Sequence, residues 1–250
     1  MKKKMIALLA GALLTMAASN AMAAFAVGDL YRVVYNRAGS VEVATDLGSI
    51  SSLLAGGAVT ADTFSLSQVT GATSANDLYV AYYASTGSTG TAYVGTPSAP
   101  TTGSRKFSYF NTGYQNNQAY FQSLSPTATT VVASQSYINS YNSQMNTAGN
   151  IGTLAGYLPT AANSGNAIGD QNLATLLASG GKTTLYSIPG SAYVMTGTAT
   201  NLVLATNFNT ATGIGSTSLV PAATPTPIPA AAYLLGSGLL GLVGIRRKQK

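Results

Sequence analysis

Short runs of strand-forming residues dominate the first half of the chain. Residues 29–35 and 40–45 are two such runs, and the glycine-bearing segment 36–39 between them predicts a β-hairpin. Residues 63–67 alternate apolar and polar side chains, which is typical of a half-exposed strand. The pattern of the first hairpin returns at residues 77–87, with Asp, Leu, Tyr, Tyr and Gly at equivalent positions. We interpret the repeat as a second hairpin of the same sheet system, in preference to a propeller blade.

Helical and strand patterns alternate in the second half of the chain. Residues 129–145 carry apolar side chains at helical spacing. Residues 170–180 predict a clearer helix, which Asp170 caps and Gly180 ends. Further strands are predicted around and beyond the turn pair Pro189-Gly190, at residues 183–188, 192–196 and 201–206.

These patterns predict a mainly β, antiparallel, sandwich-like domain with one or two helices. We place this domain at residues 24–210. Residues 211–229 consist mostly of Gly, Ser, Thr, Ala and Pro, with no core-forming pattern beyond Leu219-Val220. Such a composition predicts an extended linker.

The N-terminus is typical of a secretory signal peptide. Lys2-Lys3-Lys4 forms a basic region, residues 5–14 are apolar, and Ala21-Met22-Ala23 matches a cleavage site. Ten apolar residues are too few to span a membrane, so we expect residues 1–23 to be removed and the mature chain to start at Ala24. An uncleaved N-terminal anchor is the competing interpretation.

The C-terminus carries a second targeting pattern. A proline-rich break at residues 225–229 precedes residues 230–245, which contain no charge and would span roughly 24 Å as a helix. The last five residues, 246–250, include Arg246, Arg247 and Lys248. A basic end of this kind holds its side of a membrane-spanning helix in the cytoplasm. We therefore predict a transmembrane helix at residues 230–245 with a basic cytoplasmic tail.

The order of these features resembles a known sorting signal. Pro227-Ile228-Pro229-Ala230, a glycine-patterned apolar helix and a basic cluster together look like the PEP-CTERM sorting domain in its VPLPA variant. The resemblance is confined to the tail, and Thr226 stands where the variant usually carries Val. It implies export in a Gram-negative bacterium, transient anchoring in the inner membrane and processing by an exosortase-like enzyme. The body would then reach the cell surface or the extracellular polysaccharide, whereas a plain tail anchor is the competing interpretation.

Charge and missing residue types exclude several function classes. Of 12 basic residues, three lie in the signal peptide and four in the tail, so the domain holds five basic and six acidic residues. Its net charge of −1 leaves no basic patch for nucleic acid. The chain has no cysteine and no histidine, which excludes disulfides, Ser-His-Asp triads and histidine-based metal sites.

The remaining residues predict no catalytic, cofactor-binding or metal site. Glu42 and Asp46 would lie roughly 13 Å apart along one strand, too far for a glycosidase pair. A carboxylate pair built from distant segments stays open. Ser179 and Lys182 match the S-x-x-K pattern of a serine nucleophile, but we favour a helix end followed by a strand.

An aromatic cluster is the one stretch that suggests a ligand. It begins in a predicted strand at residues 105–110 and offers Tyr109, Tyr114 and Tyr120 as a candidate surface for sugars or proteins. The interpretation that its rings fill the core of a sheet is favoured.

From the sequence we therefore expect a non-enzymatic, exported cell-surface or matrix protein. A carbohydrate-binding or adhesive module is the alternative, and an extracellular hydrolase is disfavoured by the missing histidine. The expected partners are the processing enzyme, the inner membrane and exopolysaccharide.

Overall fold

The structure is a computed structural model, which describes residues 24–59, 63–87, 90–100, 107–146, 170–190 and 196–220. All of these residues belong to one compact unit that extends to Val220. Residues 192–195 of one predicted strand, and everything beyond Val220, lie outside the described part. In the described ranges no helix is long and apolar enough to cross a membrane. The helix predicted at residues 230–245 lies beyond them.

The described strands form one curled antiparallel sheet. Its order is β3-β10-β9-β8-β5-β4-β1-β2-β6, with β7 paired to β4 beside this path. The bounds are β1 Asp29–Tyr35, β2 Val41–Ser49, β3 Thr63–Ser65, β4 Tyr79–Ser85, β5 Thr91–Thr96, β6 Thr130–Ser134, β7 Asp170–Asn172, β8 Lys182–Pro189, β9 Thr198–Asn209 and β10 Ile214–Leu219. The prediction of a mainly β, antiparallel fold with few helices is confirmed.

The two predicted hairpins lie side by side in this sheet. β1 pairs with β2, β4 pairs with β5, and β1 also pairs with β4, with Tyr31 opposite Tyr83. The interpretation of the repeat as two hairpins of one sheet is confirmed. All seven residues of β1 are buried. A strand covered on both faces needs no alternation of apolar and polar side chains, which explains its nearly continuous apolar run.

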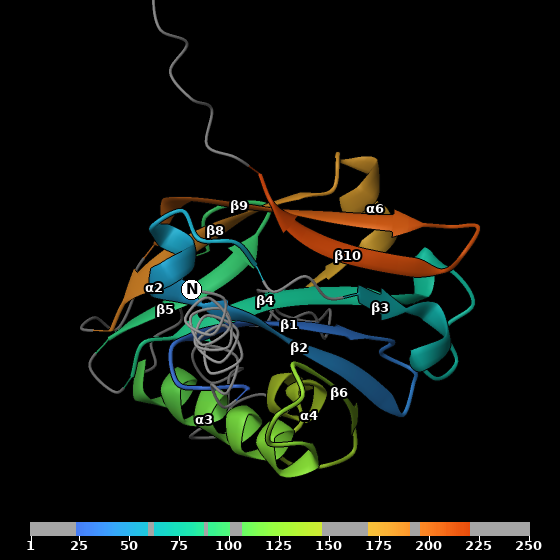
Figure 1. Cartoon of the computed structure of the whole chain (residues 1–250), viewed down its shortest axis with the longest axis horizontal. Helices are drawn as coiled ribbons and strands as arrows, with labels where there is room; N and C mark the ends of the chain where they lie inside the picture. The colour runs from blue at the N-terminus through green and yellow to red at the C-terminus, as the bar shows by residue number, and fades with distance from the viewer. Residues whose placement is uncertain are drawn as a thin grey trace, which may run out of the picture. The chain divides into compact units, whose positions relative to one another are not determined.

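The sheet curls so that its β9–β10 end lies over β1 and β4 (Figure 1). We call the enclosed apolar cluster the inner core; it includes Leu30, Val34, Val80, Leu185 and Leu204. The opposite face of β1, β2 and β4 forms a second cluster beneath the long helix α3, which we call the helix-covered core. It includes Tyr31, Val33, Tyr83, Tyr114 and Phe121.

A fully buried arginine joins the two ends of the sheet within the inner core. Arg32 of β1 donates from Nη1 to Thr217 Oγ1 of β10 at 3.0 Å and from Nη2 to Thr45 Oγ1 at 2.8 Å. Its guanidinium also lies 4.8 Å from the ring centre of Phe64, a cation–π contact. The hydroxyl of Tyr82 is hydrogen-bonded to Thr217 at 2.9 Å. Thr217 therefore connects β10 to both β1 and β4.

Four α-helices are described, against the one or two predicted. They are α2 Ile50–Leu54, α3 Phe107–Leu124, α4 Tyr141–Asn146 and α6 Leu173–Ala178. In Figure 1, α3 and α4 lie on the side of the sheet away from β9 and β10.

Three helix and strand predictions are wrong in detail. The strand predicted at residues 105–110 is the start of α3, because aromatic residues at helical spacing face the sheet along its whole length. Residues 129–145 are not one helix: β6 pairs with β2, and α4 follows after a turn. Asp170 does not cap α6 because it belongs to β7, whereas Asn172 accepts from the Thr175 N–H at 3.2 Å.

The boundary of the predicted linker is also wrong. Residues 214–219, placed in the linker, form β10 and pair with both β9 and β3. The inward-facing Thr217 is 5% exposed, although its neighbours are Ser, Gly and Leu. A strand whose inward contacts are partly polar carries a weak hydrophobic signal, so composition alone favoured a linker. The folded unit therefore extends to Val220.

Removing the Thr217 hydroxyl should destabilise the domain. Thr217→Val keeps the side-chain shape but takes a hydrogen-bond partner from both Arg32 and Tyr82. A buried group left without its partner costs about 1–3 kcal/mol. We expect urea unfolding of residues 24–220 to show a loss of that size. Thr198→Val, at an exposed position of β9, is the matched control and should change little. Equal losses in the two variants would contradict this role.

Candidate functional site

The aromatic cluster lies within the core, as the favoured interpretation expected, although on a helix. Tyr114 is fully buried, its ring stacks on Tyr31 at 4.8 Å, and its hydroxyl donates to the Asp29 carbonyl at 2.8 Å. Tyr120 is 8% exposed, and its hydroxyl accepts from the Ser134 N–H at 2.9 Å. Tyr109 is half-buried and packs against the same core. These three tyrosines therefore present no shared surface to a ligand.

The only glutamate holds the start of α4. Glu42 of β2 is fully buried, and its two carboxyl oxygens accept from the backbone N–H groups of Tyr141 at 2.7 Å and Asn142 at 2.9 Å. Burial raises the pKa of Glu42 to about 8, although both N–H groups act in the opposite direction. This side chain is enclosed by the protein and serves to position α4 against β2.

Two aspartates from different strands form a carboxyl pair at the start of the domain. Asp46 accepts from the N–H of Phe25 at 2.6 Å and from the N–H of Gly48 at 2.8 Å. Asp29 accepts from the N–H of Ala26 at 2.7 Å. Burial and the adjacent Asp46 raise the pKa of Asp29 to about 7. We call these two residues the Asp29–Asp46 pair.

The sequence left open a carboxylate pair from distant segments but did not identify this one. The register of the β1–β2 hairpin was the available signal, since it sets Tyr31 opposite Asp46 and brings Asp29 near it. A register shift between Asp29 and Tyr31 makes the distance between Asp29 and Asp46 difficult to predict from sequence spacing alone. Both carboxyls are at least nine-tenths buried, which leaves little access for a substrate.

The other described acids also have structural partners. Asp170 forms an ion pair with Arg37 at 3.0 Å and accepts from the Tyr35 hydroxyl, and the Arg37 guanidinium lies 3.7 Å from the ring centre of Tyr79. Asp77 accepts from two N–H groups at the start of a single 3₁₀ turn, and these bonds lower its pKa. Within the ranges that the structure describes, no group of three or more acids could hold a metal ion.

The S-x-x-K match is explained by local structure. The Ser179 hydroxyl donates to the Leu176 carbonyl at 2.8 Å where α6 ends, and Lys182 is the exposed first residue of β8. Gly181 between them has a positive φ of 70°, and a Cβ there would lie 2.5 Å from the Thr206 carbonyl oxygen. The segment is therefore a tight turn from helix to strand, as expected from the sequence.

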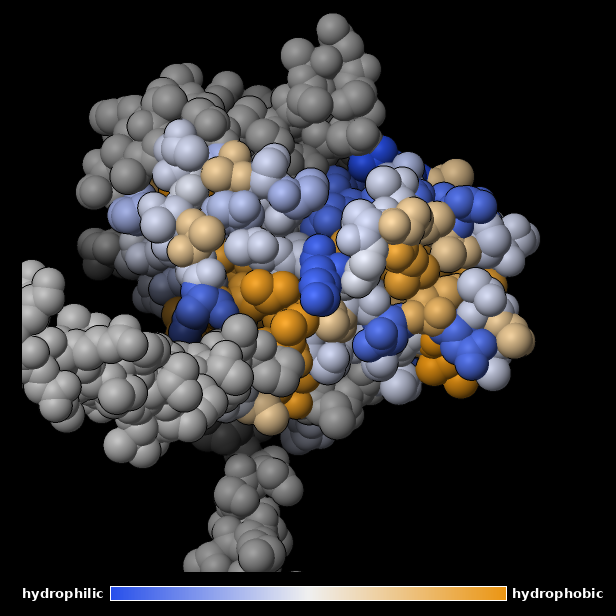
Figure 2. Space-filling view, turned by 90° about the horizontal axis from the view of Figure 1, so that it is seen from above, coloured by the Kyte–Doolittle hydropathy of each residue, from blue (hydrophilic) through white to orange (hydrophobic). Residues whose placement is uncertain are grey.

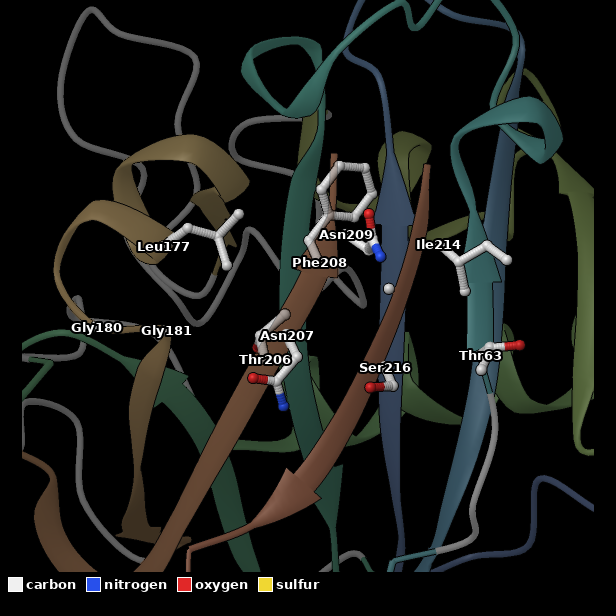
Figure 3. Close-up of a pocket in the computed structure, with 11 residues that line it drawn as sticks. Thr63, Leu177, Gly180, Gly181, Thr206, Asn207, Phe208, Asn209, Ile214 and Ser216 are labelled. Atoms are coloured by element: carbon white, nitrogen blue, oxygen red, sulfur yellow. The ribbon is translucent and has the colours of Figure 1, made fainter. Parts of the chain in front are cut away.

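An open, uncharged pocket of about 650 Å³ lies beside this turn. Leu177 of α6 borders it on one side and Ile214 of β10 on the other, with Phe208 of β9 between them (Figure 3). Asn207 and Ser216 add an amide and a hydroxyl, and neither side chain has a hydrogen-bond partner among the described residues. Because the lining carries no charge, the pocket suits a neutral ligand with hydroxyl groups and an apolar face.

Apolar side chains also appear elsewhere on the surface. On the face seen from above, they form patches between polar ones (Figure 2). Around the end of β6, Val132, Tyr137 and Ile138 are 49%, 48% and 71% exposed. Exposed apolar groups of this kind are suited to contacts with other molecules.

The predicted terminal sites lie outside the described residues. They are the cleavage residues Ala21 and Ala23, the motif Pro227, Ile228, Pro229 and Ala230, and the basic residues Arg246, Arg247 and Lys248. Comparison with family models, with curated proteins and with solved structures gives no match.

Stability should fall as pH rises from about 5 to about 8. Because the pKa of Glu42 is raised from 4.5 to about 8, the folded state holds a proton that the unfolded state releases in this window. Its contribution is full below pH 4.5 and is lost through pH 8, at up to about 1.4 kcal/mol per pH unit. Glu42→Gln should reduce this dependence in urea unfolding measured across the window, and the remaining slope should come from Asp29, whose pKa is also raised, to about 7.

Asp77→Asn is the control for this measurement. The pKa of Asp77 is lowered, so its contribution changes below pH 4 and leaves the window from 5 to 8 unaltered. If Glu42→Gln retained the full slope of the unsubstituted protein, Glu42 would not be the titrating group.

Proposed function

We propose that the chain is an exported cell-surface or extracellular-matrix protein of a Gram-negative bacterium, with a structural or interaction role. The observation that carries this proposal is the order of the tail: Pro227-Ile228-Pro229-Ala230, an uncharged segment at residues 230–245 and a basic end.

The proposed route has two processing steps. Residues 1–23 direct export and are removed, while residues 230–245 hold the precursor in the inner membrane and residues 246–250 remain in the cytoplasm. An exosortase-like enzyme then acts at or near residues 227–230 and releases the body to the surface or matrix. The body would be a sandwich-like domain followed by a short linker from residue 221.

The contacts of the acidic residues support a non-enzymatic role. Glu42 positions α4, the Asp29–Asp46 pair binds backbone N–H groups, and Asp170 pairs with Arg37. General acid–base chemistry needs such groups to reach a substrate, whereas these are buried and engaged by the protein. The surface instead offers neutral polar groups and exposed apolar side chains, which suit binding.

The tail can be tested with two variants of the full chain. An arginine at a helix centre costs roughly 2.5–3.5 kcal/mol on insertion scales, so Leu240→Arg should weaken the membrane stop and reduce surface delivery. Replacing Pro227 and Pro229 with Ala should extend the helix outward, and uncleaved precursor should accumulate in the membrane fraction. Cell fractionation with an antibody against the body measures both effects.

Leu240→Ile is the matched control because it keeps the segment apolar and should be processed normally. Wild-type size and wild-type surface levels for both the arginine and the alanine variants would show that the tail is not a sorting signal.

A second candidate function is binding of a neutral polysaccharide at the pocket beside α6. The favouring observation is the combination of Phe208 and Ile214 with the unengaged polar groups of Asn207 and Ser216. A pyranose has one apolar face and a rim of hydroxyls, and this lining could contact both.

Binding of residues 24–220 to the cell's own exopolysaccharide tests this candidate. The double variant Asn207→Ala, Ser216→Ala should bind about 5- to 150-fold more weakly, since two lost hydrogen bonds correspond to about 1–3 kcal/mol. The control is Thr198→Ala, because Thr198 is exposed on β9, the strand of Asn207, but lies outside the pocket. Unchanged binding by the double variant would exclude the pocket, and no binding by the unsubstituted domain would leave only the structural role.

A further inference from the structure

The first residues of the described domain are buried rather than exposed. Ala24 is 4% exposed and Phe25 is fully buried. The Phe25 ring packs on Tyr31 at 5.2 Å and on Phe121 at 5.3 Å between ring centres. Gln122 of α3 donates from Nε2 to the carbonyls of Ala24 at 3.3 Å and Phe25 at 2.9 Å. The segment is therefore a packed part of the fold at the point where the mature chain is expected to begin.

The backbone conformation of Phe25 directs this segment toward the Asp29–Asp46 pair. Phe25 is the only described non-glycine residue with a positive φ, at 59°, and a large side chain adopts this conformation only when other contacts compensate. With this backbone conformation, the Phe25 N–H donates to Asp46 Oδ2 at 2.6 Å and the Phe25 ring packs in the helix-covered core.

The Asp29–Asp46 pair has no cationic partner in the described residues. The described ion pair joins Arg37 to Asp170. Asp29 and Asp46 interact instead with backbone N–H groups, with each other and with the neutral hydroxyls of Tyr31 and Tyr114. Two carboxyls buried together without a counter-ion repel each other when ionised, and burial itself disfavours their charge. A cation placed beside them would remove that disadvantage.

Signal-peptide removal creates such a cation at this place. Hydrolysis of the Ala23–Ala24 peptide bond consumes one water and leaves a carboxylate on Ala23 and an α-amine on Ala24. With an ordinary pKa of about 7.7–8.0, that amine is mostly protonated at neutral pH. Successive backbone nitrogens are at most about 3.7 Å apart. Since Phe25 N is 2.6 Å from Asp46 Oδ2, the Ala24 nitrogen lies within about 6.3 Å of that oxygen.

We propose that the α-ammonium group of Ala24, created by signal-peptide cleavage, binds the Asp29–Asp46 pair and stabilises the mature domain. The proposal deepens the proposed function and rests on its export step. The Asp29–Asp46 pair is then a binding site for the chain's own new terminus. Because Ala24 is buried in the fold, the peptide bond before it is cut before this segment packs, so processing precedes completion of the native state.

The charge state of the site depends on few groups. Asp29 from β1 and Asp46 from β2 face the segment, and from α3 the Tyr114 hydroxyl donates to the Ala26 carbonyl at 3.1 Å and Gln122 contributes a neutral amide. Tyr31 donates to the same Ala26 carbonyl at 2.9 Å. Burial raises the pKa of both tyrosines, so they stay neutral up to high pH. The stabilisation is therefore present at neutral pH and is lost when the α-amine deprotonates.

The test compares two proteins that differ only in where they start. Residues 24–220 and residues 20–220 are released from the same removable fusion, so that both carry a free terminus but only the first places it at Ala24. We expect a Tm at pH 7 that is higher by about 3 °C or more for the Ala24 start, since about 1 kcal/mol shifts a domain of this size by 2–4 °C. The difference should disappear at pH 10, where the amine is neutral.

Substitutions distinguish an effect of the α-ammonium charge on Tm from an effect of steric crowding by the four extra residues, 20–23. Asp46→Asn in both proteins should remove the difference, whereas Asp77→Asn should leave it intact. Equal Tm values at pH 7, or a difference that persists at pH 10, would overturn the proposal. If Asp46→Asn fails to fold, the comparison of pH 7 with pH 10 decides the matter alone. N-terminal sequencing of the exported protein tests the export step separately, because retained residues 1–23 would refute that step without altering the Tm comparison.

Discussion

The curled sheet depends on the contacts of one buried group, the guanidinium of Arg32. A charge in an apolar core is costly unless it is hydrogen-bonded, and here hydroxyls of Thr45 and Thr217 accept from its two Nη groups while a Phe64 ring covers it. Thr45 lies on β2 and Thr217 on β10, so both ends of the sheet must be in place to solvate the charge. With no disulfide available, this network specifies how the two ends face each other across the inner core.

On the other face of the sheet the buried ionisable groups are acidic instead of basic. The helix-covered core contains carboxyls whose partners are mostly backbone N–H groups, at the start of α4 and at the start of the domain. Such carboxyls fix the ends of segments in position, and burial raises the pKa of Glu42 and of Asp29. The domain thus has a few buried ionisable groups with structural roles and a surface of neutral polar residues. This division is consistent with a protein that acts by binding or by forming part of a matrix.

Much of the first half of the fold could be predicted from sequence, because β1, β2 and the repeated β4 strand carry strong local signals. The six residues from Arg105 favour a strand, because the helical period of Phe107, Tyr114 and Phe121 appears only over the full length of α3. β10 carries a weak sequence signal because its inward side chains include the polar Thr217. The hydrogen bond that makes Thr217 favourable inside the fold comes from Arg32, 185 positions away. The Asp29–Asp46 pair likewise depended on hairpin register, which spacing along one strand does not reveal.

The position of β10 also determines when the fold can be completed. It pairs with β9 and β3, so the sheet connects segments separated by some 150 residues, and the Arg32–Thr217 bond spans more of the chain still. A polypeptide that crosses a membrane from its N-terminus exposes β10 only after almost all of the domain has emerged. Long-range pairings of this kind also fold slowly. In the export route that we propose, the inner core would therefore stay open during translocation and would close only when the tail reaches the membrane.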